Sequence, residues 1–212
     1  MGKCIIFCAA GFDGLAAPIE QGDYLLAADG GLRHLQAMGL TPQGMIGDFD
    51  SLGYIPEEAN VFPVEKDDTD AMLAVRQGLT LGYREFLLYG GLDGQRLDHT
   101  VANFQTLQFL ADNGAKGYLV GKDYIVTILH RETAVFPDTA TGIFSLFCLG
   151  ADAQGVTIEN LQYPLENGTL TPGFPLGVSN HFVGKGGRIT VTEGSLLAMW
   201  DRCNGFPKEI RL

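Results

Sequence analysis

The sequence has no long hydrophobic run and few basic residues. No segment approaches the roughly 20 consecutive apolar residues that a membrane-spanning helix needs, so we expect no membrane partner. Its 212 residues include 14 Lys and Arg against 25 Asp and Glu, which gives a formal net charge of −11. This balance argues against nucleic acid or an anionic membrane surface as the main partner.

The sequence also lacks the motifs of several site classes. Its four cysteines form no CxxC pair and its four histidines share no ligand spacing, so a zinc site has little support. A Walker A sequence, a GxGxxG following a strand and a nucleophile elbow are all missing. A P-loop kinase, a standard dinucleotide enzyme and a Ser/His/Asp hydrolase are therefore disfavoured. Cys4 and Cys8 lie inside an apolar run, where we expect buried, reduced thiols and hence a cytoplasmic protein.

The first 120 or so residues alternate short apolar runs with segments of helical periodicity. The expected strands are 3–9, 24–28, 44–47, 61–64, 85–89 and 117–120. These runs are apolar on both faces, as in strands covered by helices on either side. Between them, 32–38 reads as a helix. Two further helices are expected from the apolar faces Ala71, Met72, Val75, Leu79 and Leu97, Val101, Phe104, Leu107, Leu110. This pattern predicts a parallel sheet with right-handed crossovers.

After about residue 120 the pattern changes to alternation, which is typical of strands in a β-rich domain. The segments that show it are 123–130, 143–149, 155–159 and 188–192. Asn167-Gly168 is a strong signal for a hairpin turn. We therefore place a domain boundary near 120–135.

Carboxylates cluster beside glycines in the first half of the chain. The clusters are Asp29, Asp48 with Asp50, Asp67 and Asp68 with Asp70, and Asp93 with Asp98. Each cluster follows a short apolar run, so we expect these acids to meet at one edge of the sheet, where open α/β sheets bind ligands. Like charges repel at such distances unless a cation lies among them. The economical interpretation is a Mg²⁺ site that holds a polyphosphate.

Each of these residues also has a purely structural interpretation. Helix capping or turn formation accounts well for a single Asp, above all for Asp67 or Asp68. Glycines such as Gly30 let the backbone approach a phosphate, but they also make tight strand-to-helix turns. Lys66 and Arg96 are the cations best placed to counter phosphate charge, with a solvated or paired surface role as the alternative.

Taken in order, these segments resemble the thiamine pyrophosphokinase family. The similar segments are Ala28-Asp29-Gly30-Gly31, Gly47-Asp48-Phe49-Asp50-Ser51, Lys66-Asp67-Asp68-Thr69-Asp70, Gly90-Gly91 through Arg96-Leu97-Asp98-His99, Gly155-Val156-Thr157-Ile158, Tyr163-Pro164-Leu165 and Gly177-Val178-Ser179-Asn180. Each segment alone is weak, but their order and spacing over most of the chain make the resemblance specific.

The resemblance implies an α/β fold class: an N-terminal open parallel sheet with flanking helices, plus a C-terminal β-sandwich domain. Residues 1–125 would form the nucleotide- and Mg-binding catalytic domain, and 126–212 the thiamine-binding and dimerisation domain. The implied activity is Mg²⁺-dependent transfer of diphosphate from ATP to the hydroxyl of thiamine, with release of AMP. The implied assembly is a homodimer with thiamine bound at the subunit interface.

The resemblance also implies roles for single residues. The metal ligands would be Asp48, Asp50 and Asp70. The nucleotide and its phosphates would contact Asp29, Gly30, Lys66, Thr69, Arg96 and Asp98. The catalytic residues would be Asp70, Arg96 and Asp98, and the thiamine contacts would be Asp70, Ser179 and Asn180.

Two departures from the family pattern stand out. Animal members have a tryptophan near 155–158 that can stack on thiamine, and here Ile158 or Tyr163 would have to serve. Lys66 stands where animal members have glutamine, which makes the sequence more similar to bacterial members. Two alternative functions stay open: a related diphosphokinase acting on a pterin alcohol, and a non-catalytic nucleotide- or thiamine-binding regulator.

Overall fold

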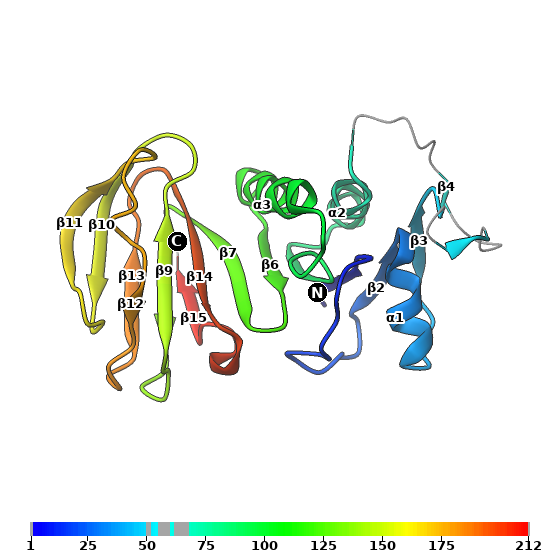
Figure 1. Cartoon of the computed structure of the whole chain (residues 1–212), viewed down its shortest axis with the longest axis horizontal. Helices are drawn as coiled ribbons and strands as arrows, with labels where there is room; N and C mark the ends of the chain where they lie inside the picture. Colours follow the sequence, from blue (N-terminus) through cyan, green and yellow to red (C-terminus); the bar gives the residue numbers. More distant parts are fainter. Residues whose placement is uncertain (1, 50–51, 55–59, 62–67, 212) are drawn as a thin grey trace. The chain divides into compact units, whose positions relative to one another are not determined.

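The computed structural model describes residues 2–49, 52–54, 60–61 and 68–211 (Figure 1). The chain divides into two compact units, Met1–Lys122 and Asp123–Leu212. Each unit has a sheet architecture of its own, parallel in the first and antiparallel in the second. None of the helices in the described part of the chain combines the length and the apolar character needed to cross a membrane.

The first unit contains a parallel sheet in the order β6-β5-β1-β2-β3-β4. Its strands are β1 (Cys4–Phe7), β2 (Tyr24–Ala28), β3 (Gly44–Gly47), β4 (Asn60–Val61), β5 (Glu85–Tyr89) and β6 (Lys116–Val120). The side chains of β1 are almost fully buried, as are most of those in β2, β5 and β6. This burial explains why these strands are continuous apolar runs without alternation.

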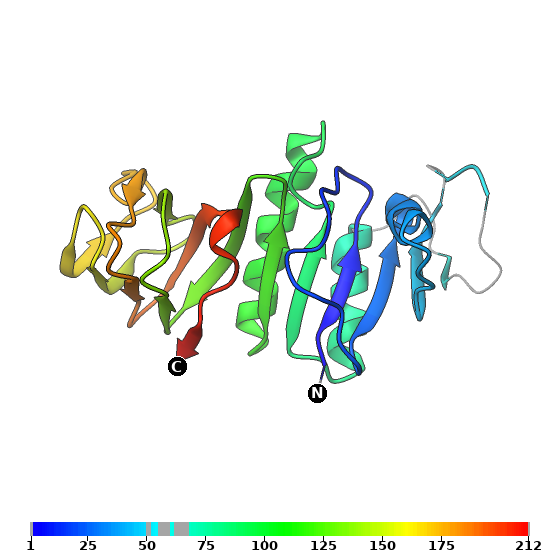
Figure 2. The same ribbon diagram turned by 90° about the horizontal axis from the view of Figure 1, so that it is seen from below.

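Helices cover both faces of this sheet. They are the short η1 (Asp29–Gly31), α1 (Leu32–Ala37), α2 (Asp70–Thr80) and α3 (Leu97–Asp112). Figures 1 and 2 show α2 and α3 side by side on one face, with α1 on the other. The chain moves toward one edge of the sheet from β2 to β3, and toward the opposite edge from β5 to β6. Right-handed crossovers therefore place α1 and α3 on opposite faces.

The helix predicted from the apolar face of Leu97 to Leu110 is present as α3, but its two ends differ in burial. The apolar face that predicted this helix includes Leu97 and Val101, whose residues are 74% and 50% exposed, whereas Leu107 and Leu110 are buried. Only the C-terminal half of α3 packs on β6 with apolar side chains. The apolar side chains at the start of the helix, Leu97 and Val101, are exposed.

The second unit contains two antiparallel sheets. One has the order β12-β9-β14-β7, and the other β11-β10-β13-β8-β15. The strands are β7 (Tyr124–His130), β8 (Thr133–Phe136), β9 (Ile143–Phe147), β10 (Ala153–Glu159), β11 (Leu165–Leu170), β12 (Asn180–His181), β13 (Gly187–Thr190), β14 (Ser195–Asp201) and β15 (Glu209–Arg211), with a short helical turn, η3 (Arg202–Asn204), after β14.

Aromatic side chains join the two sheets of the second unit. Phe136 of β8 packs against Phe144 of β9 and Trp200 of β14, with ring centroids 5.6 and 5.1 Å apart. All three rings are almost fully buried, and the Trp200 Nε1–H donates to the Gly205 carbonyl at 2.8 Å. Residues from both sheets thus share one core, as in a β-sandwich. The predicted fold class is confirmed.

The predicted hairpin turn at Asn167-Gly168 was wrong. Both residues lie inside β11, where Gly168 pairs with Val156 of β10. The register between the two strands shifts here, and Asn167 has a φ of 48°. The left-handed preference of Asn therefore serves a β-bulge instead of a turn.

Candidate active site

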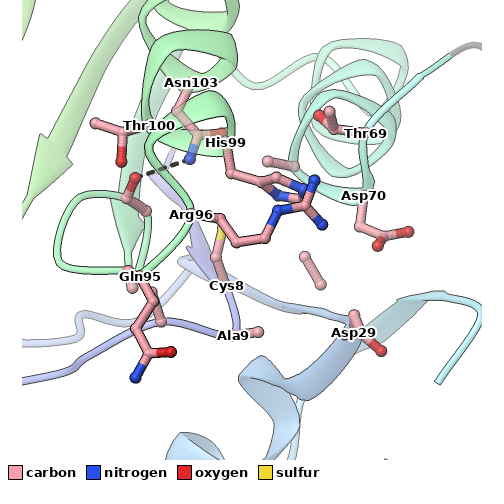
Figure 3. Close-up of a pocket in the computed structure, with 16 residues that line it drawn as sticks. Cys8, Ala9, Asp29, Thr69, Asp70, Gln95, Arg96, His99, Thr100 and Asn103 are labelled. Carbon is pink, nitrogen blue, oxygen red and sulfur yellow. Dashed lines mark hydrogen bonds between the residues drawn. The ribbon is translucent and has the colours of Figure 1, made fainter. Parts of the chain in front are cut away.

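A pocket of about 290 Å³ lies at the carboxyl edge of the parallel sheet (Figure 3). After β1 the chain continues to β2 on one side of the sheet, and after β5 it continues to β6 on the other side. Open α/β sheets bind ligands where the strand order reverses in this way. The pocket is lined by Cys8, Ala9, Ala10, Ala28, Asp29, Thr69, Asp70, Ala71, Gly90, Gly91, Gly94, Gln95, Arg96, His99, Thr100 and Asn103.

The floor of the pocket consists of backbone packed on backbone. A Cβ at position 31 would overlap the Phe7 carbonyl, and one at position 90 would overlap the Cys8 carbonyl. Gly90 also has a φ of 68°, which glycine adopts without strain. The turns after β2 and β5 can therefore rest directly on the end of β1, which keeps the floor free of bulky side chains.

The first turn of α2 supplies Thr69 and Asp70. Thr69 is the N-cap residue, and its Oγ1 accepts a hydrogen bond from the Met72 N–H at 3.2 Å. The helix dipole and the backbone N–H groups of this turn give the N-terminal end a partial positive charge, which suits a phosphate. Thr69 is therefore the residue that caps this helix, whereas Asp68 lies one residue earlier and Asp67 lies outside the described residues.

The first turn of α3 supplies Arg96. Its Nε and Nη2 donate to the two carboxylate oxygens of Asp98 at 3.1 and 2.5 Å. This bidentate contact is the main reason why the pKa of Asp98 falls to about 2, and it raises the pKa of Arg96. Figure 3 shows the guanidinium directed toward the side of the pocket that carries Thr69 and Asp70.

A buried asparagine fixes the turn that follows β5. The Asn103 Nδ2–H donates to the Gly91 carbonyl at 2.8 Å, a bond drawn in Figure 3. One turn earlier on α3, the Thr100 hydroxyl donates to the Leu92 carbonyl at 3.3 Å. Both bonds connect α3 to the wall of the pocket formed by Gly90 and Gly91.

Asp29 contributes an acidic oxygen to the opposite wall. Its Oδ1 is buried and has no hydrogen-bond partner within the part of the chain that the structure describes. The backbone at Asp29 has a φ of 48°, in the left-handed region that Asp adopts more readily than most residues other than Gly. A buried acceptor in this arrangement fits a ligand that offers a hydrogen-bond donor or a cation.

Cys8 also lines the pocket, but its chemistry is unsuited to catalysis. Burial, reinforced by the Asp70 carboxylate, raises the pKa of its thiol to about 12. A thiol with this pKa carries almost no thiolate at neutral pH and is a poor nucleophile. We assign Cys8 a packing role.

The second unit has a smaller, mainly apolar pocket of about 110 Å³. It is lined by Ile158, Tyr163, Pro164, Leu165, Leu170, Leu176, Gly177, Val178 and Asn180. The Asn180 side chain accepts from the Tyr163 N–H at 2.9 Å and donates to the Tyr163 carbonyl at 2.7 Å. Asn180 therefore holds the backbone at Tyr163, whose residue is 60% exposed. Ser179 is exposed, and its N–H donates to the Ser145 hydroxyl at 3.0 Å.

Both units match family models of the same family. Residues 16–119 match "Thiamin pyrophosphokinase, catalytic domain", and residues 130–196 match "Thiamin pyrophosphokinase, vitamin B1 binding domain". The chain belongs to the thiamin pyrophosphokinase family. The predicted family and enzyme class are confirmed.

Individual thiamin pyrophosphokinases agree with this assignment. A Bacillus subtilis protein named thiamine pyrophosphokinase is 28% identical over 181 residues, which cover 81% of this chain and 84% of that protein. The crystal structure of the Bacillus subtilis enzyme superposes with a TM-score of 0.84 at 23% identity, covering 94% of this chain and 98% of that one. The Candida albicans enzyme superposes with a TM-score of 0.75 at 13% identity, covering 94% and 88%.

The structure brings together four of the residues that the sequence assigned to a thiamin pyrophosphokinase site. Asp29, Thr69, Asp70 and Arg96 line the same pocket although they come from three separate turns. Asp98 does not line it, but holds Arg96 from outside. The roles assigned to these residues stay predictions.

The remaining predicted residues of the first unit lie elsewhere or outside the description. Gly30 is buried within η1, and Asp48 is half-buried directly after β3. Asp50 and Lys66 lie outside the described residues. Within the described ranges, no group of three or more His, Cys, Asp or Glu has a metal-binding arrangement.

The sequence analysis missed several polar residues of this thiamin pyrophosphokinase pocket, above all His99, Thr100 and Asn103. A signal for them was present. They follow Arg96 at spacings of three, four and seven, which places all four residues on one face of a helix. A polar stripe at the start of a helix that follows a strand of a parallel sheet points to a ligand.

Proposed function

We propose that this chain catalyses the Mg²⁺-dependent transfer of the terminal diphosphate of ATP to the hydroxyl of thiamine. The bond between the β-phosphorus and the oxygen that bridges it to the α-phosphorus would break, and the thiamine oxygen would bond to that β-phosphorus. AMP would leave with the bridging oxygen, and the proton of the thiamine hydroxyl would be released. The observation that supports this most is the convergence of Asp29, Thr69, Asp70 and Arg96 on one pocket from separate turns.

The residues present fit a magnesium ion held with phosphate. Mg²⁺ takes hard oxygen ligands and usually only one or two carboxylates, with phosphate oxygens and water completing its shell. Asp70 lines the pocket, and the buried Oδ1 of Asp29 has no partner among the described residues. We propose Asp48, Asp50 and Asp70 as the metal ligands, with Asp50 outside the described residues. When bound, the ion would offset the negative charge of the polyphosphate.

The side chains of the pocket would supply alignment and charge. Phosphoryl-type transfer asks little covalent chemistry of the protein, so positioning and electrostatic stabilisation dominate. The N-terminal turn of α2 and the Arg96 guanidinium would bind phosphate oxygens, and Arg96 would offset the charge that grows on departing AMP. Lys66 and Gly30 are proposed as further nucleotide contacts. Asp70 would also orient the attacking hydroxyl.

Thiamine binding is proposed to involve the second unit. Ser179 and Asn180 are the proposed contacts, and the pocket beside Asn180 is mostly apolar. Of the two residues considered for stacking, Ile158 is 5% exposed and Tyr163 is 60% exposed. We therefore favour Tyr163, whose ring is more available and whose backbone is held by Asn180.

We further propose a homodimer with thiamine at the subunit interface. Large apolar side chains are exposed on the second unit at and near its pocket, with Tyr163, Phe174 and Leu176 each more than half exposed. Such exposure in one region is typical of an interaction site. A cytoplasmic location is supported by the four cysteines, which are all unpaired and of which three are buried.

The function is tested by incubating the protein with ATP, thiamine and MgCl₂ and measuring AMP and thiamine diphosphate. We expect both products in equal amounts, and none after EDTA treatment. Products from a pterin alcohol but not from thiamine would replace this function with the related diphosphokinase. Binding of nucleotide or thiamine without AMP would favour a non-catalytic regulator.

A further inference from the structure

Arg76 lies outside the pocket but contacts the segment that supplies Thr69 and Asp70. Its Nε donates to the Asp68 Oδ2 at 2.8 Å. Side chains on a helix tilt toward its N-terminus, so the long Arg76 side chain runs back along α2 to meet a residue eight positions earlier. Asp68 immediately precedes the N-cap residue Thr69. This ion pair therefore restrains the turn through which the chain enters α2.

The same guanidinium also contacts the neighbouring helix. Its central carbon lies 4.6 Å from the centroid of the Phe109 ring on α3, within the range of a cation–π interaction. Arg76 thus links the segment before α2, α2 itself and α3. The first turns of these two helices supply Asp70 and Arg96 to the pocket.

Pairing with Arg76 also controls a negative charge beside the site. Thr69 and Asp70 line the pocket but Asp68 does not. An unpaired carboxylate next to Thr69 would repel a polyphosphate and compete for its cation. The ion pair offsets this charge and holds the Asp68 carboxylate against the Arg76 guanidinium.

We infer that Arg76 is a positioning residue for the proposed reaction. By holding Asp68 against α2 and α3, it fixes the turn that presents Thr69 and Asp70 to the substrate. The inference rests on the proposed function only for its catalytic consequence. The Arg76 and Asp68 side chains are 48% and 30% exposed, so the pair contributes little to global stability.

The kinetic test uses Arg76→Met, which keeps the hydrocarbon stem, Asp68→Asn and the double variant. We expect each single variant to lower kcat about tenfold or more, with melting temperatures close to wild type. The kcat of the double variant should lie within about twofold of that of the less active single variant, because both changes remove the same interaction.

Arg84→Met is the matched control. It removes the same charge and leaves a side chain of the same shape as in Arg76→Met. Arg84 lies beyond the C-terminal end of α2, where its guanidinium donates to the Leu79 and Tyr83 carbonyls. Its kcat should equal that of the wild type. A kcat in Arg76→Met equal to wild type, or an equal loss in Arg84→Met, overturns the inference.

Amide hydrogen exchange tests the positioning separately from the activity. The Met72 and Leu73 amides donate to the Thr69 hydroxyl and carbonyl. In Arg76→Met we expect them to exchange about tenfold faster or more, with the Gly82 amide unchanged. Unchanged exchange at Met72 and Leu73 overturns the inference. If the wild type forms no thiamine diphosphate, the proposed function fails, whereas this measurement still decides whether Arg76 holds the turn.

Discussion

Asp98 and Arg96 form a bidentate ion pair at the surface of the first unit, at the entrance to the pocket. The pKa of Asp98 is lowered to about 2, mainly by the hydrogen bonds from Arg96. A lowered carboxylate pKa stabilises the folded protein above the unfolded pKa, about 3.8, and this contribution is lost as the pH falls toward 2. The pair should therefore be fully formed at every pH at which the enzyme works.

We predict that a carbon-detected NMR titration places the Asp98 carboxyl pKa near 2 in the wild type. In Arg96→Met it should return toward the ordinary value of 3.8, because the guanidinium is the main cause of the shift. An Asp98 titration that is the same in both proteins would contradict the ion pair.

Asp70 and Asp48 are predicted to be essential to turnover. Asp70→Asn and Asp48→Asn each keep the size of the side chain but remove the charge of a proposed metal ligand. We expect kcat to fall about 10²-fold or more, the scale of losing one electrostatic stabiliser. Asp112→Asn makes the same change on the exposed far end of α3 and should leave kcat unchanged. Full activity in both site variants would exclude the proposed metal site.

Single residues of the site could be predicted where a strand end preceded them. Asp29 directly follows β2 and Asp48 directly follows β3, so the parallel sheet alone places both at one edge. Asn103 could not be predicted in this way. It lies two turns into α3, and its role depends on a tertiary hydrogen bond to Gly91. The helical spacing of Asn103 after Arg96 indicates the face on which it lies, but not that its side chain bonds to Gly91.

At the scale of the elements, α2 depends on its N-cap. Thr69→Ala removes the acceptor for the Met72 N–H, and we expect the free energy of unfolding to fall by about 1 kcal/mol. Thr69→Ser keeps an oxygen in the same position and should stay close to wild type. Urea unfolding measures both variants. Equal stability of Thr69→Ala and wild type would show that the cap contributes nothing.

Strands could be predicted from the sequence where they form apolar runs. The prediction failed where the conformation that a residue prefers locally serves a different structure in the folded chain. The buried runs that form β2, β3 and β5 were predicted with the observed bounds. Asn167-Gly168 was mistaken because the left-handed conformation that favours a hairpin turn also suits a bulge within a strand. Leu97 and Val101 helped to predict α3 correctly, but helical spacing does not show which part of an apolar face is covered, and both residues are exposed.

At the scale of the whole molecule, the exposed apolar side chains of the second unit bear on its assembly. We predict that sedimentation equilibrium gives twice the mass of one chain. Phe174 is 64% exposed, and Phe174→Lys should weaken association by placing a charge among these apolar groups. Leu81→Lys, at an exposed apolar position of the first unit, is the control and should not change the mass. A wild-type mass of one chain would refute the dimer.

The close packing at the end of β1 has a consequence for protein engineering. The turns after β2 and β5 both rest on the same stretch of main chain, through Gly31 and Gly90. If one of these turns were replaced by that of a relative, its different backbone conformation would clash with the main chain at the end of β1, which has no room to move. Chimeric enzymes should therefore tolerate exchange of the three junctions as one block far better than exchange of any one alone.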